Sequence, residues 1–208
     1  MPGLVSVGTP AYRSGMSVEI LPATADRFDD AEHALTGGGD GPSCQCQWWT
    51  LRNEPFRTTT KEEKIEMLRA ELATEPSPGL IAYVDGTPAG WVRVGPRVRQ
   101  ARIAATRMIT ANSPEPLDDP SVWAVTCFVV RKEHRGSGLM ARLLDAAVSH
   151  ARDGGARAVE AYPFDPTVKK RPANELYHGV LQVFTDAGFD IVAQPRPDRA
   201  LVSLTLDA

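Results

Sequence analysis

Residues 127–144 constrain the possible fold of this chain more than any other segment. They form an apolar run, a charged turn, a glycine loop and an amphipathic segment in direct succession. The apolar run ends at Val130, and Gly136 and Gly138 stand just before apolar residues that recur at helical spacing. A loop between a strand and a helix brings unpaired backbone N–H groups and the positive end of a helix dipole to one point. The segment therefore predicts an anion-binding site between a buried strand and a helix.

Apolar periodicity and turn residues along the whole chain predict an α/β fold with a mixed sheet, because hairpins and crossovers both occur. The turn Asp85-Gly86 between two apolar runs is typical of a β-hairpin. Strands are expected over residues 18–21, 80–84, 90–94, 122–130, 157–162, 191–193 and 200–206. Helices are expected over residues 24–35, over 60–72 behind a capping box, over 138–151 and over 174–187. Residues 41–57 and 96–120 are expected to be largely irregular, with a short basic helix around 99–107.

Length and composition are those of one globular domain. The chain has 208 residues, and we assign the domain to residues 17–208, behind a flexible Gly-, Ser- and Pro-rich tail over 1–16. A net charge of −3 argues against a nucleic-acid partner, and no apolar run reaches membrane-spanning length. The start of the chain lacks a signal-peptide pattern and the three cysteines are an odd count, so we expect a cytoplasmic protein. Cysteines and histidines are not spaced as metal ligands, so no metal site is expected.

The residues alone leave the ligand of the glycine loop open. The glycines would suit a plain turn, but residues 131–135 carry more positive charge than a connection needs. The Gly-x-Gly-x-x-Ala pattern over 136–141 fits a dinucleotide-binding loop, with Glu160 about 20 residues further on. Against that interpretation, the charged turn separates the strand from the glycines, and little chain remains for further parallel strands.

A third interpretation comes from a resemblance. The run from Val130 through Arg135 and Gly138 to Leu144 resembles the acetyl-CoA motif of the GCN5-related N-acetyltransferases (GNAT), Arg/Gln-x-x-Gly-x-Gly/Ala. Met140 departs from the small residue usual at its last position. Residues 184–189 resemble the Tyr-x-x-x-Gly-Phe end of that family's final helix, with Phe184 in place of the tyrosine.

The resemblance implies a fold, an activity and a set of partners. The fold is a central twisted sheet, mixed but mostly antiparallel, flanked by helices and splayed between its two central strands. The activity is transfer of the acetyl group of acetyl-CoA to a primary amine, on a small molecule or a lysine, by direct attack in a ternary complex. The protein would be a monomer or a homodimer. Two alternatives stay open: a coenzyme A-binding regulatory module that no longer catalyses, and a dinucleotide-binding enzyme.

The resemblance also implies where acetyl-CoA binds. The splayed strand would face the pantetheine arm, and the loop N–H groups would hold the pyrophosphate, with Arg135 adding a charged hydrogen bond. The residues implied are Phe128, Val129, Val130, Arg135, Gly136, Ser137, Gly138, Leu139 and Met140. The cations of residues 169–171 are a further candidate contact with the phosphates.

Candidate catalytic and acceptor residues lie elsewhere in the chain. Because Phe184 has no proton to give, Tyr177 becomes the candidate acid for the leaving thiolate, two turns earlier on the same predicted helix. Glu160 and Tyr162 are candidates for the base, since they share one face of the strand beside the splay. The dense cluster over residues 44–49 would wall the acceptor pocket. The residues named there are Cys46, Trp48 and Trp49.

Overall fold

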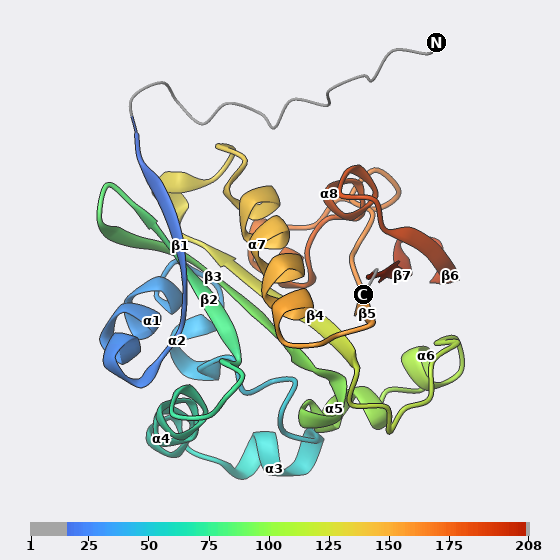
Figure 1. Cartoon of the computed structure of the whole chain (residues 1–208), viewed down its shortest axis with the longest axis horizontal. Coiled ribbons are helices and arrows are strands. Elements are labelled where there is room, and N and C mark those ends of the chain that lie inside the picture. Colours follow the sequence, from blue (N-terminus) through green and yellow to red (C-terminus); the bar gives the residue numbers. More distant parts are fainter. Residues whose placement is uncertain (1–15, 207–208) are drawn as a thin grey trace.

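The computed structural model describes residues 16–206, so the predicted tail lies, except for Met16, outside the described residues. Seven strands form one sheet in the order β1-β2-β3-β4-β5-β7-β6 (Figure 1). They are β1 (Val18–Pro22), β2 (Gly79–Val84), β3 (Thr87–Pro96), β4 (Val122–Val130), β5 (Ala158–Ala161), β6 (Asp190–Arg196) and β7 (Arg199–Thr205). Neighbours run antiparallel except β4 and β5, which are parallel. The prediction of a mixed, mostly antiparallel sheet is confirmed.

Helices cover both faces of the sheet, and each face has its own apolar core (Figure 1). One core packs under α1 and α4, and the other packs under α7 and α8. The α-helices are α1 (Phe28–Leu35), α2 (Gly41–Cys44), α3 (Asn53–Thr58), α4 (Lys61–Leu72), α5 (Ala101–Ala104), α6 (Arg107–Thr110), α7 (Leu139–Asp153) and α8 (Leu181–Asp186). The 3-10 helices are η1 (Ala25–Arg27), η2 (Arg97–Arg99), η3 (Lys132–His134) and η4 (Ala173–His178). None of the described helices is long and apolar enough to cross a membrane.

The two central strands, β4 and β5, separate halfway along the sheet. Strand β5 pairs with β4 only as far as Ala161, which lies opposite Val125. On its other side β4 stays paired with β3 up to Val130, with a bulge at Thr126. The second half of β4 therefore presents one backbone edge without a neighbouring strand. The predicted splay is confirmed, and it leaves peptide N–H and C=O groups available to a ligand.

One local detail of the sequence-based prediction is confirmed, and two others are wrong. Thr60 and Glu63 form the expected capping box at the start of α4. Thr24 does not cap η1, because its hydroxyl donates to Asp26 instead. Residues 41–57 contain α2 and most of α3 instead of being irregular.

The predicted helix over residues 174–187 is wrong as one element. Gly179 has φ +87°, a left-handed value that ends η4, and Val180 then pairs with Phe164 as an isolated β-bridge. Only after this break does α8 begin. Tyr177 and Phe184 therefore do not share a helix face, which removes the spacing argument that linked them.

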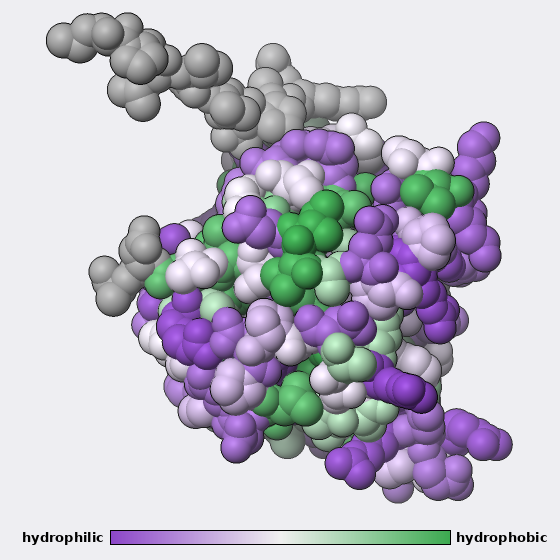
Figure 2. Space-filling view, turned by 90° about the vertical axis from the view of Figure 1, so that its right-hand side faces the viewer, coloured by the Kyte–Doolittle hydropathy of each residue, from purple (hydrophilic) through white to green (hydrophobic). Residues whose placement is uncertain are grey.

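The surface beside β6 and α8 faces the viewer in Figure 2, which is turned by a quarter from Figure 1. Strand β6 forms the edge of the sheet, and Ile191 is 49% exposed there. In this view apolar residues form separate patches between hydrophilic ones. The arrangement is that of an ordinary solvated surface.

Candidate functional site

The glycine loop of the sequence lies at the N-terminus of α7, as predicted. Gly136 and Gly138 have φ +72° and +82°, left-handed values that glycine adopts without steric cost. Gly138 is the residue before α7, and no side chain caps this helix end. The first N–H groups of α7 therefore lack intrahelical partners and point out of the helix with its positive dipole end. A Cβ on Gly136 would meet no atom within 4 Å, so the space beside the loop is open.

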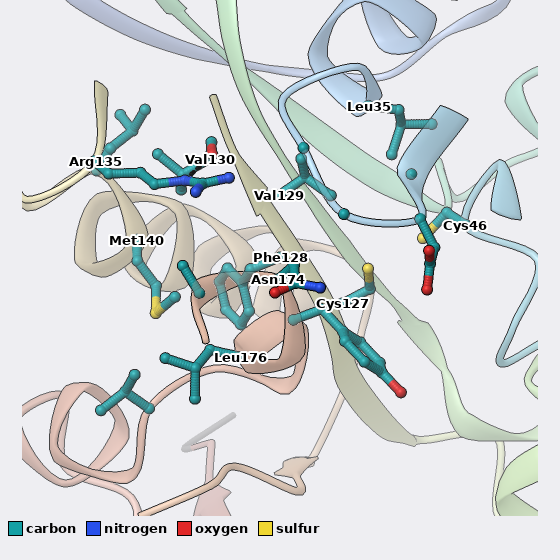
Figure 3. Close-up of a pocket in the computed structure, with 18 of the residues that line it drawn as sticks. Leu35, Cys46, Cys127, Phe128, Val129, Val130, Arg135, Met140, Asn174 and Leu176 are labelled. Carbon is teal, nitrogen blue, oxygen red and sulfur yellow. Dashed lines mark hydrogen bonds between the residues drawn. The ribbon is translucent and has the colours of Figure 1, made fainter. Parts of the chain in front are cut away.

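The Arg135 side chain ties this loop to a second run of glycines. Its Nε donates to the Val130 carbonyl at 3.0 Å, and its NH2 group donates to the Gly37 carbonyl at 2.9 Å. Figure 3 shows the guanidinium extended alongside Val130. Gly39 packs against Asn174 of η4, so residues 37–39 link the glycine loop to η4. Arg135 therefore holds the glycine loop, the end of β4 and residues 37–39 together at the rim of a cavity.

A cavity of about 1380 Å³ lies between the split strands, the glycine loop and the segment around α2 and α3. We divide its lining into two halves. The loop half consists of Val130, Arg135, Gly136, Gly138, Leu139 and Met140. The thiol half consists of Cys44, Cys46, Cys127, Trp48, Phe56 and Lys64. Phe128 and Val129 of β4 lie between them, and the volume exceeds the roughly 300–1,000 Å³ of an ordinary small-molecule site.

Trp48 and Trp49 play different parts in the thiol half. Trp48 is half-buried and meets Phe56 edge-on, with 5.0 Å between ring centroids. Trp49 also touches the cavity, but it is only 3% exposed and its Nε1 donates to the Thr126 carbonyl at 3.0 Å. Trp49 therefore holds the β4 bulge in place, whereas Trp48 presents more surface to a ligand.

Two cations cover the aromatic faces of the thiol half. The Arg102 guanidinium lies 3.7 Å from the Trp48 ring centroid, and the Lys64 ammonium lies 4.1 Å from that of Phe56. Lys64 is only 8% exposed, and it forms no salt bridge with any residue between 16 and 206. This wall of the cavity is therefore positively charged as well as aromatic.

The three cysteines all line the thiol half, and their environments differ. Burial raises the pKa of Cys44 to about 11. Burial also disfavours ionisation of Cys46, but a hydrogen bond from the Cys127 thiol and the charge of Arg93 outweigh it and lower the pKa of Cys46 to about 6. The hydrogen bond to Cys46, with burial, raises the pKa of Cys127 well above its usual value. Of the three sulfurs, Cys46 is therefore the one whose thiolate its surroundings favour most.

Tyr177 lines the cavity, although it arrives there from η4 instead of the predicted helix. Its ring lies on that of His178, with 4.0 Å between centroids. Burial raises the pKa of Tyr177 to about 12, so the hydroxyl keeps its proton at neutral pH. Phe184 is fully buried between Phe128 and Phe189 in the core beneath α7 and α8, away from the lining.

Glu160 lies in β5 and Tyr162 directly follows the end of that strand, and neither side chain lines the cavity. Glu160 is fully buried, accepts a hydrogen bond from Arg97 at 2.8 Å and bonds the Ser113 hydroxyl. The Tyr162 hydroxyl donates to the same carboxylate at 3.1 Å. Arg97 and Ser113 therefore bind this buried carboxylate, and neither Glu160 nor Tyr162 is among the lining residues of the cavity. The prediction that one of them is the base finds no support in the cavity lining.

The basic run over residues 169–171 also stays away from the cavity lining. Arg171 pairs with Asp198 at 2.5 Å and with Glu175 at 3.0 Å. Lys169 and Lys170 are exposed. Of the predicted loop residues, Ser137 is the one outside the lining, and its hydroxyl bonds the His134 carbonyl. Among the described residues, no group of three or more His, Cys, Asp or Glu side chains gathers as a metal site would require.

Sequence reasoning missed Cys127, Lys64 and Asn174 as lining residues. Strand alternation places Cys127 on the opposite face of β4 from Phe128, and that much was readable. Lys64 lies among apolar positions of an amphipathic helix, a weak signal of a buried ammonium. Asn174 gave no signal, because it lies in the short η4 where the sequence predicted the start of one longer helix.

Comparisons with known proteins agree with this architecture. The sequence model of the acetyltransferase (GNAT) family matches residues 46–179. The GNAT domain of S. lividans PAT is 19% identical, with a TM-score of 0.54 and 94% of each chain covered. The protein yncA of Salmonella typhimurium, solved with its cofactor acetyl-CoA, is 16% identical, with a TM-score of 0.53 and 91% of this chain and 94% of that chain covered.

A third solved structure is paiA N-acetyltransferase from Thermoplasma acidophilum in complex with coenzyme A, at 12% identity and a TM-score of 0.52, covering 91% of this chain and 99% of that one. No curated protein sequence matched the chain. At these identities the solved structures establish the fold alone. The family match spans well over half of the 208 residues and includes β4, the glycine loop and α7. The chain therefore belongs to the acetyltransferase (GNAT) family.

Proposed function

We propose that this acetyltransferase moves the acetyl group of acetyl-CoA onto a primary amine by direct attack within a ternary complex. The observation that carries the proposal is the continuous cavity, because its two halves are chemically different and meet at the open edge of β4. One half has the backbone groups that suit a polyphosphate, and the other has the side chains that suit a small organic acceptor.

The loop half fits the donor substrate. The N–H groups between Gly136 and Met140 would hold the pyrophosphate, since they are free of partners within α7. Peptide groups of Phe128, Val129 and Val130 would hold the pantetheine arm along the open edge of β4. Leu139 and Met140 add apolar surface at the start of the helix. Arg135 contributes by holding the rim through Gly37, and its guanidinium would add a positive charge beside a bound phosphate.

The thiol half fits the acceptor. An alkyl amine must lose a proton before it attacks, because its ordinary pKa is about 10.4. The Cys46 thiolate, next to Cys127, gives this end of the cavity a negative charge that attracts an ammonium. The Lys64 ammonium against Phe56 and the Arg102 guanidinium against Trp48 add positive charge beside the aromatic side chains of this half. This polarity favours an amine that carries an acidic group at its other end, as an amino acid does.

Proton delivery to the departing thiolate falls to Tyr177. The residue lines the cavity and holds its proton at neutral pH, because its pKa is about 12. The leaving thiol has an ordinary pKa of about 8.5, so the acid assists the step but is not indispensable. Since Glu160 and Tyr162 do not reach the cavity, we assign the removal of the amine proton to water.

The principal rival is a coenzyme A-binding module without activity, which the Phe184 substitution suggests. The position of Tyr177 weighs against it, since the cavity has an acid that does not depend on Phe184. Release of free thiol from acetyl-CoA, followed with a panel of amines, decides between them. We expect thiol release that depends on the amine, with intersecting lines in double-reciprocal plots of the initial rate against one substrate at several concentrations of the other. Binding of coenzyme A without thiol release would support the module. Parallel lines in those plots would overturn direct attack in a ternary complex. Thermal stabilisation by NAD(P) alone would favour the dinucleotide interpretation instead.

A further inference from the structure

Cys46 is held in a way that a residue with only a packing role does not need. It has φ +56°, and Gln45 before it has φ +48°, so two successive side-chain-bearing residues occupy the left-handed region. Such conformations persist only where surrounding contacts impose them, and they gather at functional sites. The contacts that hold Cys46 converge on its sulfur.

Two donors point at the Cys46 sulfur from β3. Trp91 Nε1 and Arg93 Nε each lie 3.2 Å from Sγ. An indole N–H and a guanidinium donate and do not accept, so the sulfur acts as the acceptor toward both. The other nitrogens of Arg93 bond Glu71 at 3.1 and 2.8 Å, which fixes the guanidinium in place. The pair Arg93 and Glu71 thus aims a fixed positive charge at Cys46.

The Cys127 thiol is the third donor to this sulfur. Figure 3 shows the sulfur atoms of Cys46 and Cys127 turned toward one another. Both residues line the thiol half, so a small uncharged molecule that enters the cavity reaches them even though the chain buries them. The arrangement places a stabilised sulfur anion against a protonated thiol inside a ligand-accessible space.

We propose that Cys46 and Cys127 form a peroxide-reactive pair, and that peroxide joins them in a disulfide that weakens binding of the amine acceptor. Cys46 is the attacking sulfur and Cys127 the resolving one. Cys44 lines the same half but takes no part, because its burial disfavours the thiolate.

The chemistry balances with a hydroperoxide as the oxidant. The Cys46 thiolate attacks one peroxide oxygen, the O–O bond breaks, and hydrogen peroxide leaves a Cys46 sulfenic acid and a hydroxide ion. The Cys127 thiol, deprotonated by that hydroxide, attacks the Cys46 sulfur. The S–O bond breaks, the S–S bond forms, and hydroxide leaves. Overall the Cys46 thiolate and the Cys127 thiol lose two electrons and one proton, and the peroxide becomes one water molecule and one hydroxide ion.

Oxidation changes the charge of the thiol half. In the reduced state the Cys46 thiolate, Arg93 and Glu71 together carry one negative charge. The disulfide removes the charge of Cys46 and leaves a neutral set, so an ammonium loses an attractive partner. This part of the inference rests on the proposed function, whereas the formation of the disulfide does not.

The decisive experiment is peptide mapping of the native, reduced protein after brief treatment with hydrogen peroxide. The expected product lacks two of the three free thiols and contains one cross-linked peptide joining Cys46 to Cys127. Cys44→Ser should still form that link, whereas Cys46→Ser should form none. Three intact thiols, or a link that includes Cys44, would overturn the proposal. Because mapping uses the unsubstituted chain, the result does not depend on whether a variant folds.

Kinetics then test the effect on the acceptor. Peroxide should raise the KM for the amine about tenfold, leave the KM for acetyl-CoA nearly unchanged, and be reversed by dithiothreitol. Unchanged amine kinetics in protein shown to carry the disulfide would overturn the acceptor-binding part. If the reduced protein acetylates no amine but peptide mapping still finds the link between Cys46 and Cys127, the proposed function is wrong and the proposed disulfide is confirmed.

Discussion

The loop half and the thiol half of the cavity are built in opposite ways. The loop half consists mainly of backbone: two left-handed glycines, the uncapped start of α7 and the open edge of β4, all within one stretch of chain. The thiol half consists of side chains from α2, α4, β4 and the segments between them. Backbone sites of this kind recognise the constant part of a substrate, whereas assembled side chains determine which variable partner is accepted.

The largest effect is expected in the loop half. Gly136→Asp should weaken acetyl-CoA binding about 1,000-fold, since a carboxylate would stand where the pyrophosphate is expected and Gly136 has open space beside it. Gly155→Asp is the matched control, because Gly155 has φ +80°, no neighbour within 4 Å of an added Cβ, and a place at the far end of α7. Calorimetric titration of both folded variants is the measurement. Equal affinities in the two would refute an anion site at this loop.

Tyr177 lines the cavity, and removal of its hydroxyl should act on turnover and not on binding. Tyr177→Phe should lower kcat about 100-fold, the usual scale of general acid catalysis, with acetyl-CoA affinity nearly kept. Tyr83→Phe is the control, since the Tyr83 hydroxyl bonds Asp30 outside the cavity lining. A fall of less than about threefold would make Tyr177 structural and leave water as the acid.

The pH dependence of kcat follows from the raised pKa of Tyr177. Because that pKa is about 12, the acid stays protonated, and kcat should not decline between about pH 7 and about pH 10 through loss of its proton. A descending limb within that range in the native enzyme, absent from Tyr177→Phe, would show that the hydroxyl titrates earlier than its burial indicates.

In the thiol half, substitution of Trp48 should affect binding of the amine, whereas substitution of Trp49 should affect stability. Trp48→Ala should raise the KM for the amine about tenfold and leave that for acetyl-CoA unchanged, because Trp48 is the half-exposed ring of the wall. Trp49→Ala should instead lower the free energy of unfolding by about 3–5 kcal/mol, since it removes a buried ring and the bond to Thr126. Chemical denaturation and steady-state kinetics distinguish the two. If both variants lose the same free energy of unfolding and keep the same KM for the amine, Trp48 has only a packing role.

The same contrast explains what the sequence could predict. Strand β4, Gly136, Gly138 and α7 are contiguous, so apolar periodicity and two glycines sufficed to place the loop half. The break at Gly179 was hidden, because the residues around it look helical and the φ of a single glycine decides the outcome. The burial of Glu160 was equally hidden, since its partner Arg97 lies 63 positions away in the chain. Long-range pairings of this kind follow from tertiary packing, which local patterns do not encode.

The smallest effect concerns the polarity of the thiol half, and it tests whether side chains choose the acceptor. An amine with a distal carboxylate should have a kcat/KM about tenfold above that of a diamine of equal length, because the Lys64 ammonium lines the thiol half and the Arg102 guanidinium lies against its Trp48 ring. Lys64→Gln should reduce this ratio to about threefold or less, since it removes one of the two cations. Lys61→Gln, an exposed position on the same helix, should leave the ratio unchanged. A diamine preference in the native enzyme would mean that the distal end of the acceptor does not bind beside Lys64.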